Sequence, residues 1–198
     1  MSLLINIIFD FSCPYCYLAW GYTRKLQERI PFEVDWTTWE IHPDLPKKGR
    51  NIYEVVPGVN LEEWCYKLNA LGAPVDLIPG NKVFVPNTRS ALETAEFARE
   101  NQKLQEWVDA VFQSSFVENR DIGDIDVLLD LAEDIGLNCD KLQRTLKMDY
   151  YGKVLLANDQ TCVERQIEWV PTIYVGENKI LEGAFTFSDF EKAVRKFF

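Results

Sequence analysis

Apolar residues recur along this chain with two periods, one typical of strands and one typical of helices. Residues 3–9 form an almost continuous apolar run, LLINIIF, which predicts a buried strand. A helical spacing follows, with apolar residues at Leu18, Ala19, Tyr22, Leu26 and Ile30. After Pro31, apolar and acidic residues alternate over residues 32–36, which predicts a second strand with one polar face. The chain therefore opens as strand, helix and strand.

The pattern changes between about His42 and Trp169, where the apolar residues follow a helical period. Three segments place apolar residues on one face of a helix: Leu61, Trp64, Cys65, Leu68 and Leu71; Leu104, Trp107, Val108, Val111 and Phe112; and Val127, Leu128, Leu131, Ala132 and Ile135. Gly136 ends the third helix, Asp140 is placed to cap the next one, and another helix is expected over residues 153–167. The block is too continuous to be a loop, so we interpret it as an inserted helical subdomain.

The strand period returns near the end of the sequence. Residues 172–175, a Gly-Glu-Asn turn and residues 179–181 predict an antiparallel hairpin. A final amphipathic helix is expected from about Ser188. The sum is strand–helix–strand, a helical block, then hairpin and helix, which is an α/β architecture.

Charge and hydropathy narrow the classes of function. The 198 residues carry a net charge of −10, and no block of lysine and arginine appears, so no nucleic-acid partner is expected. No apolar run approaches the length of a membrane span, and the first residues lack the basic segment of a signal peptide. We therefore expect no membrane partner and a cytoplasmic location. The odd number of cysteines, five, also fits a compartment that keeps thiols reduced.

The sequence Cys13-Pro14-Tyr15-Cys16 supplies the candidate chemistry, because it lies between the first strand and the first helix. Pro14 suits the first turn of that helix, and Ser12 is placed to cap it. A cysteine at a helix N-terminus is favoured as a thiolate, and a second thiol one turn on allows disulfide exchange. Five cysteines would produce such a pair by chance about 0.1 times. The other cysteines and the single histidine are scattered, so no metal site is expected.

The architecture and this motif together resemble the DsbA-like thiol oxidoreductases, and within them the cytoplasmic FrnE-type branch. The stretches that carry the resemblance are residues 9–17, 40–44, 86–88, 170–172 and 182–184. The resemblance implies an α/β, thioredoxin-like fold with an inserted all-helical subdomain. Residues 1–41 and 170–198 would form the thioredoxin-like domain, and residues 42–169 the helical insertion.

The same resemblance implies a cis peptide bond between Val170 and Pro171. There the proline would pack against the sulfurs, and the Val170 backbone would pair with an extended substrate. Without the cysteine motif, a trans proline opening an edge strand would be the expected structure. Trp169 stands where the family commonly has glycine. Val170 and Pro171, with Pro14 and Tyr15, are therefore the candidate substrate-binding residues.

We assign Cys13 as the nucleophile and Cys16 as the resolving thiol. The Pro-Tyr dipeptide also occurs in glutaredoxins, whose potentials of about −200 to −230 mV lie above a cytosolic poise near −290 mV. The difference favours the dithiol by about 3–4 kcal/mol, so a reductase or isomerase is expected rather than a net oxidase. The expected partner is a disulfide or thiol substrate, either a protein, glutathione or a small molecule. No cofactor is expected, although glutathione is a candidate co-substrate. The sequence leaves the oligomeric state open.

Two other functions stay open. Kappa-type glutathione transferases and hydroxychromene-carboxylate isomerases share the fold but carry serines where this chain has Cys13 and Cys16. They also carry an Asp-Arg pair after the last strand, where this chain reads Gly-Ala-Phe. A non-catalytic binding module is the other reading, with exposed aromatic residues near the motif: Tyr15, Tyr17, Trp20 and Trp169. For Trp20 we favour a place in the core, and for Tyr15 an exposed one.

Several further residues have structural interpretations. Cys65 and Cys162 lie on apolar helical stripes and are expected to be buried, whereas Cys139 is expected to be more exposed. His42 is favoured as a hydrogen-bonded turn residue over a catalytic base. The carboxylate of Asp10 would raise the pKa of a nearby sulfur. Asn87 is placed to cap a helix over residues 88–99.

Overall fold

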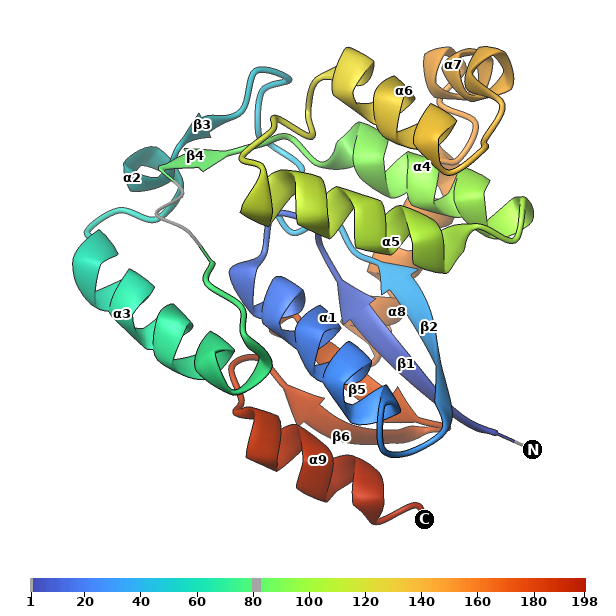
Figure 1. Ribbon diagram of the computed structural model, residues 1–198. Helices are drawn as coiled ribbons and strands as arrows, with labels where there is room; N and C mark the ends of the chain where they lie inside the picture. Colours follow the sequence, from blue (N-terminus) through green and yellow to red (C-terminus); the bar gives the residue numbers. More distant parts are fainter. Residues whose placement is uncertain (1, 80–82) are drawn as a thin grey trace.

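A four-stranded sheet organises the computed structural model, which describes residues 2–79 and 83–198 (Figure 1). Its strands are β1 (Leu3–Phe9), β2 (Phe32–Thr38), β5 (Thr172–Val175) and β6 (Asn178–Glu182), in the order β2–β1–β5–β6. β1 pairs parallel to β2 and antiparallel to β5, and β5 and β6 form an antiparallel hairpin. The four strands predicted from the apolar pattern are therefore confirmed.

The central position of β1 explains its apolar composition. Ile5, Ile7, Ile8 and Phe9 are all buried, as expected for a strand that is paired on both edges and covered on both faces. Asn6 is the exception in this run, and its amide donates to the Thr37 hydroxyl at 2.8 Å. The one polar side chain within the strand is thus satisfied by a polar neighbour on β2.

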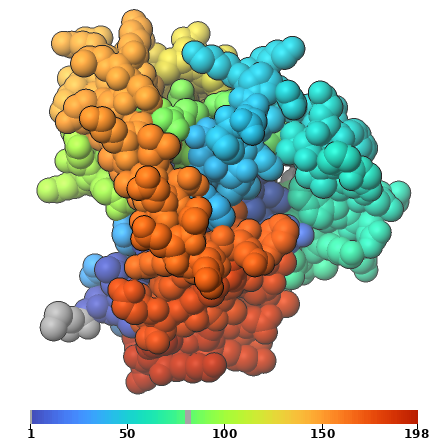
Figure 2. Space-filling model, turned by 180° about the vertical axis from the view of Figure 1, so that it is seen from behind, coloured from blue at the N-terminus to red at the C-terminus, as the bar shows by residue number. Residues whose placement is uncertain are grey.

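Helices cover both faces of the sheet. α1 (Pro14–Gln27) and α9 (Phe187–Arg195) lie on one face, and α8 (Gly152–Glu164) lies on the other, as the two opposite views show (Figures 1 and 2). α9 begins with a capping box between Thr186 and Asp189, close to the predicted start. α8 ends three residues before the predicted Ile167, where Gln166 has a φ of +52°. The helical period continues past the point where the backbone leaves the helix.

The segment between β2 and β5 is mostly helical. Its helices are α2 (Ile52–Val55), α3 (Leu61–Gly72), α4 (Arg89–Glu100), α5 (Leu104–Phe112), α6 (Ile125–Asp134), α7 (Cys139–Lys147) and α8, with a 3₁₀ turn over Ala73–Val75 and a π-helical turn over Gln113–Val117. It also holds a short antiparallel pair, β3 (Arg50–Asn51) with β4 (Phe84–Val85), which the sequence did not predict. Two residues per strand are too few for a period to be read.

Helix termini in this segment follow from individual residues. Gly136 has a φ of +79° and ends α6, as predicted. The predicted cap of α7 was wrong: Asn138, not Asp140, accepts from the backbone N–H of Lys141 at 2.8 Å. Asp140 lies in the first turn instead, where its charge still favours the helix.

One aromatic cluster joins the sheet to the helical segment. Phe112 of α5 packs against Phe11 at 5.2 Å between ring centroids and against Phe9 at 6.0 Å. Trp36 of β2 lies 5.3 Å from Phe9 and 6.3 Å from Phe112. Because this core is shared, the division into residues 1–41 with 170–198 and residues 42–169 stays a prediction.

No helix within the described ranges is long and apolar enough to span a bilayer.

Candidate active site

The end of β1 delivers Cys13 to the N-terminus of α1. Cys13 is the N-cap residue, with an extended backbone, and its carbonyl oxygen accepts from the N–H of Cys16 at 3.0 Å and of Tyr17 at 3.2 Å. Pro14 is the first helical residue, as predicted. The predicted cap, Ser12, was wrong. Its hydroxyl and its N–H both donate to the Asp10 carboxylate at 2.7 Å instead, which leaves the N-cap position to the cysteine.

The two sulfurs of the motif have different access to solvent. The Cys13 side chain lines a groove and keeps 7% of its surface exposed, whereas Cys16 is fully buried beneath it. The Cys13 thiol donates to the carbonyl oxygen of Val170 at 3.6 Å. The peptide bond between Val170 and Pro171 is cis. The structure therefore brings the motif together with the Val170 loop, 157 residues away in the sequence.

The environment of Cys16 favours its neutral form. Burial raises the pKa of the Cys16 thiol well above its ordinary value of 9.0, and the hydrogen bond and electrostatic interaction with Cys13 raise that pKa further. The Asp10 carboxylate, also fully buried, acts in the same direction. Cys16 thus holds a proton while the more accessible Cys13 faces the groove.

Asp10 is held by four donors from three parts of the chain. Besides Ser12, the Ile41 N–H and the Thr88 hydroxyl both donate to its second oxygen at 3.1 Å. Burial raises the pKa of Asp10, and these hydrogen bonds oppose that rise. The proximity of Asp10 to the motif was evident from the sequence, but these partners were not, because Ile41 and Thr88 lie 31 and 78 residues away.

The groove beside Cys13 has a volume of about 860 Å³. α1, the segment after β2, α2, α3 and the residues before β5 all contribute to its walls. In Figure 2 the orange residues before β5 lie beside the teal residues of α3. Four of the six predicted site residues line this groove, Cys13, Pro14, Tyr15 and Val170, while Cys16 lies beneath it and Pro171 follows Val170.

Aromatic side chains frame the groove. Trp169 is 67% exposed on one side, and Trp64 on the other donates its indole N–H to the Tyr15 hydroxyl at 3.2 Å. Tyr15 is therefore half-buried rather than exposed, contrary to the prediction. His42 lines the same groove and is half-buried, and its backbone carbonyl accepts from Leu45 in a turn.

A carboxylate on β6 fixes the loop that carries Trp169. One Glu182 oxygen accepts from the backbone N–H groups of Glu168 at 2.6 Å and Trp169 at 3.1 Å. The other oxygen pairs with Lys179 at 2.5 Å. Sequence reasoning missed Glu182 as a positioning residue. Glu182 follows the strand predicted over residues 179–181 and begins one of the stretches that carry the family resemblance, but the loop it holds lies 13 residues earlier.

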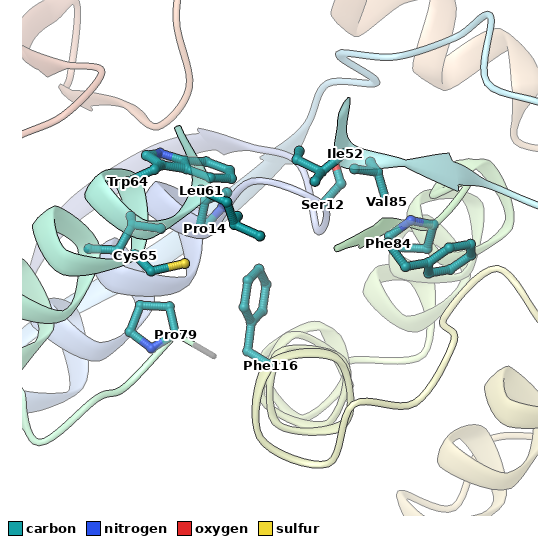
Figure 3. Close-up of a pocket in the computed structure, with 12 residues that line it drawn as sticks. Ser12, Pro14, Ile52, Leu61, Trp64, Cys65, Pro79, Phe84, Val85 and Phe116 are labelled. Atoms are coloured by element: carbon teal, nitrogen blue, oxygen red, sulfur yellow. The ribbon is translucent and has the colours of Figure 1, made fainter. Parts of the chain in front are cut away.

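A second, smaller cavity of about 30 Å³ lies beside Pro14 (Figure 3). Cys65 and Phe116 point toward it from two different helical turns. Cys65 and Cys162 are buried and Cys139 is half-buried, as predicted. The placement of Trp20 in the core is also confirmed, since it is buried and its indole N–H donates to Asp109.

Two other candidate residues, Tyr17 and Asn87, have structural roles in the core and at a helix start. Tyr17 stacks on Phe116 within the core, with ring centroids 4.5 Å apart. Asn87 does accept from the Arg89 N–H at 3.1 Å, but the N-cap residue of α4 is Thr88. Within residues 2–79 and 83–198, no group of three or more histidine, cysteine or acidic side chains could hold a metal ion.

Comparison with known families identifies the class of protein. The DSBA-like thioredoxin domain matches residues 4–195, and the chain therefore belongs to this family. Its fold is the thioredoxin fold, and DsbA-like proteins are generally oxidoreductases or isomerases. The resemblance inferred from the motif is thus confirmed at the level of the family. A relative from Bacillus subtilis (strain 168), the uncharacterized protein YwbO, is 29% identical over 201 residues, covering 98% of this chain and 96% of that protein.

Solved structures share the fold across the whole chain. The probable DsbA oxidoreductase SCO1869 of Streptomyces coelicolor matches with a TM-score of 0.86 at 20% identity, over 98% of this chain and 89% of that one. A 2-hydroxychromene-2-carboxylate isomerase matches with a TM-score of 0.71 at 16% identity, over 98% and 96%. The cytosolic disulfide reductase DsbM of Pseudomonas aeruginosa, solved with GSH, matches with a TM-score of 0.66 at 15% identity, over 98% of each chain.

Proposed function

We propose that this protein is a thiol-disulfide oxidoreductase in which Cys13 attacks the substrate and Cys16 resolves the mixed disulfide. The observation that carries the proposal is the asymmetry of the two sulfurs. Cys13 lines an open groove at a helix N-terminus, and Cys16 lies one turn further on, buried and protonated. Membership of a family of thiol-disulfide oxidoreductases supports the same reading.

The proposed reaction exchanges one disulfide for another. The Cys13 thiolate attacks one sulfur of the substrate disulfide, and the other substrate sulfur leaves as a thiolate and takes up a proton. Cys16 then loses its proton and attacks the Cys13 sulfur, which releases the second substrate thiol. The protein ends as a Cys13–Cys16 disulfide, oxidised by two electrons, and the substrate ends as two thiols. A low-molecular-weight thiol or a dithiol protein returns the pair to the reduced form.

The burial of Cys16 supports a reducing direction. A strongly oxidising dithiol owes its potential to a stabilised reduced form. The raised pKa of Cys16 means that ionisation of this thiol adds no such stabilisation, which favours a more reducing pair. The proposed role is therefore that of a reductase or isomerase. Assignment to the FrnE-type branch and a cytoplasmic location stay predictions.

We assign substrate contacts to the residues on both sides of Cys13. Pro14 and Tyr15 contribute one wall, and the Val170 backbone, preceding Pro171, lies within 3.6 Å of the sulfur on the other. An extended substrate segment that pairs with this backbone would carry its disulfide to Cys13. A peptide disulfide, oxidised glutathione and a small-molecule disulfide all fit this general scheme.

The test uses single-cysteine variants of the reduced protein and a peptide disulfide. Cys16→Ser should still attack and should accumulate a mixed disulfide on Cys13, visible as the mass of one peptide half. Cys13→Ser should form no such adduct and should lose at least about 1,000-fold in rate. Wild-type protein should accumulate the intramolecular disulfide instead. An adduct on Cys65 or Cys139 in place of Cys13 would refute the assignment.

The alternative is a glutathione-dependent transferase or isomerase, and the shared fold of the 2-hydroxychromene-2-carboxylate isomerase is the observation that favours it. Such a reaction needs no resolving thiol. Glutathione-dependent turnover that survives in Cys16→Ser at the wild-type rate would therefore support the alternative. Loss of turnover in that variant, with the mixed disulfide trapped, would exclude it.

A further inference from the structure

We propose that the substrate disulfide lies in a polypeptide segment that is both apolar and positively charged. This inference rests on the proposed function, since it specifies what the groove beside Cys13 selects. It follows from two features of that groove, the apolar walls and the excess of carboxylates at their margin.

The apolar walls of the groove come from segments far apart in the chain. Beyond the aromatic residues already described, they include Ile41, Ile52, Val55, Val56, Val59 and Val85. Val56 remains 41% exposed although it faces this surface. A substrate with apolar side chains beside its disulfide would cover this area and gain from its removal from water.

The margin of the groove is acidic. Four carboxylates line it, Glu40, Glu63, Asp159 and Glu168, against one lysine, Lys67. The ammonium group of Lys67 is already paired with Glu63 at 2.6 Å, so it is not left to neutralise an incoming anion. Glu40 is paired with Arg89 outside the groove.

The two remaining carboxylates lie on the side of Trp169. Asp159 accepts from the indole N–H of Trp39 at 3.0 Å, and Glu168 precedes Trp169. Both residues are exposed, and in the described part of the chain neither forms an ion pair. They present two carboxylates that lie outside any close ion pair beside the path to Cys13, with Lys179 near enough to Glu168 for the two charges to interact.

This arrangement favours lysine and arginine near the substrate disulfide. Their aliphatic stems would lie along the apolar walls while their charged ends reach the carboxylates at the margin. Oxidised glutathione has the opposite character: it is small, polar and net negative, so the same carboxylates repel it. Complementary charge acts mainly on the rate of encounter, and salt weakens it.

The test compares two symmetric disulfide-linked peptides that differ only in charge. Each half has one cysteine between leucines, flanked by two lysines in one peptide and by two glutamates in the other. Reduced protein is mixed with each peptide, and the second-order rate of oxidation is divided by the rate with 2-mercaptoethanol, which corrects for the intrinsic reactivity of the peptide. The corrected rate should be at least about tenfold higher for the lysine peptide at low salt, and the ratio should fall at 0.5 M salt. Oxidised glutathione should react more slowly than either leucine-flanked peptide.

Matched variants place the preference in the groove. Glu168→Gln should lower the lysine-to-glutamate ratio by about twofold or more. Glu118→Gln removes the same charge from an exposed site outside the groove and should leave the ratio unchanged. Equal corrected rates, or a faster reaction with the glutamate peptide or with glutathione, would overturn this inference and leave the proposed function standing. No reaction with any of the three disulfides would refute the proposed function and the inference together.

Discussion

Two cysteines three residues apart acquire opposite properties because their side chains enter different surroundings. Cys13 is the N-cap residue beside a groove, while Cys16 points beneath it toward buried groups that include the Asp10 carboxylate. The sequence predicted that Asp10 would raise the pKa of a neighbouring sulfur, and it does so for Cys16. The effect falls on the resolving thiol, since Asp10 and Cys16 are both fully buried and little water screens the charge between them.

Replacement of Asp10 by asparagine should therefore lower the pKa of Cys16. The substitution removes a buried negative charge, and a thiolate is easier to form without it. It also places an amide NH₂ where two donors now point, so the free energy of unfolding should fall by about 1–3 kcal/mol. The measurement is the pH titration of the Cβ carbon signals of labelled cysteines, together with urea unfolding.

Thr88→Val is the matched control at this site. It removes one hydrogen bond to Asp10 and keeps the carboxylate. The free energy of unfolding should fall by about 1 kcal/mol. The pKa of Cys16 should shift to lower pH by less than it does in Asp10→Asn. If the two variants displaced the Cys16 titration equally, the charge of Asp10 would not be the cause.

At the scale of elements, Arg89 ties α4 to two other parts of the fold. Its guanidinium reaches Glu93 on the same helix at 2.7 Å, Glu40 after β2 at 3.0 Å and Asp149 between α7 and α8 at 3.1 Å. Glu93 is only 4% exposed, and burial raises the pKa of its carboxyl group. Arg89 is the cation that makes this buried charge tolerable.

Arg89→Ala should lower the free energy of unfolding by about 2–4 kcal/mol at pH 7, because it leaves the Glu93 carboxylate buried without its partner. A carboxyl group with a raised pKa in the folded state weakens the fold only where the unfolded state has lost the proton. The deficit should therefore shrink as the pH falls through the raised pKa of Glu93, and should be gone below about 4.5, the ordinary value for this group. Urea unfolding at pH 7 and pH 4 measures both effects.

Two comparisons separate this effect from the loss of any arginine. The double variant with Glu93→Gln should be more stable at pH 7 than Arg89→Ala alone, since the unpaired charge is gone. Arg120→Ala breaks an ion pair with Asp130, which is exposed, and should cost less than about 1 kcal/mol. An equal loss in Arg89→Ala and Arg120→Ala would contradict the role of the buried carboxylate.

Elements were predictable from the sequence where the apolar period was long, and individual caps were not. The run over residues 3–9 and the α5 stripe each repeat their pattern several times, so the strand and the helix could be inferred locally. Ser12 and Asp140 failed as caps because a neighbouring residue occupied the cap position. Ser12 instead meets Asp10, whose other partners are distant in sequence. The groove was unpredictable for the same reason, since its walls come from separated segments between Ser12 and Val170.

At the scale of the whole molecule, Phe112 couples the helical segment to the sheet. It is fully buried and packs against aromatic residues of β1, β2 and α1, among them Phe9, Trp36 and Tyr17. Phe11, which leads into the cysteine motif, packs against the same ring. A core built across both predicted domains should make them fold as one cooperative unit.

Phe112→Ala should lower the free energy of unfolding by about 3–5 kcal/mol, because it opens a cavity at the junction of the sheet and the helical segment. Tryptophan fluorescence and far-ultraviolet circular dichroism should still report one coincident urea transition, at a lower midpoint. Leu156→Ala is the control: Leu156 lies on α8 with 60% of its surface exposed, and its loss should cost less than about 0.5 kcal/mol. Two separate transitions in the wild-type protein would instead show that residues 42–169 unfold independently. The helical segment would then be a domain in the thermodynamic sense, and the aromatic cluster an interface rather than a shared core.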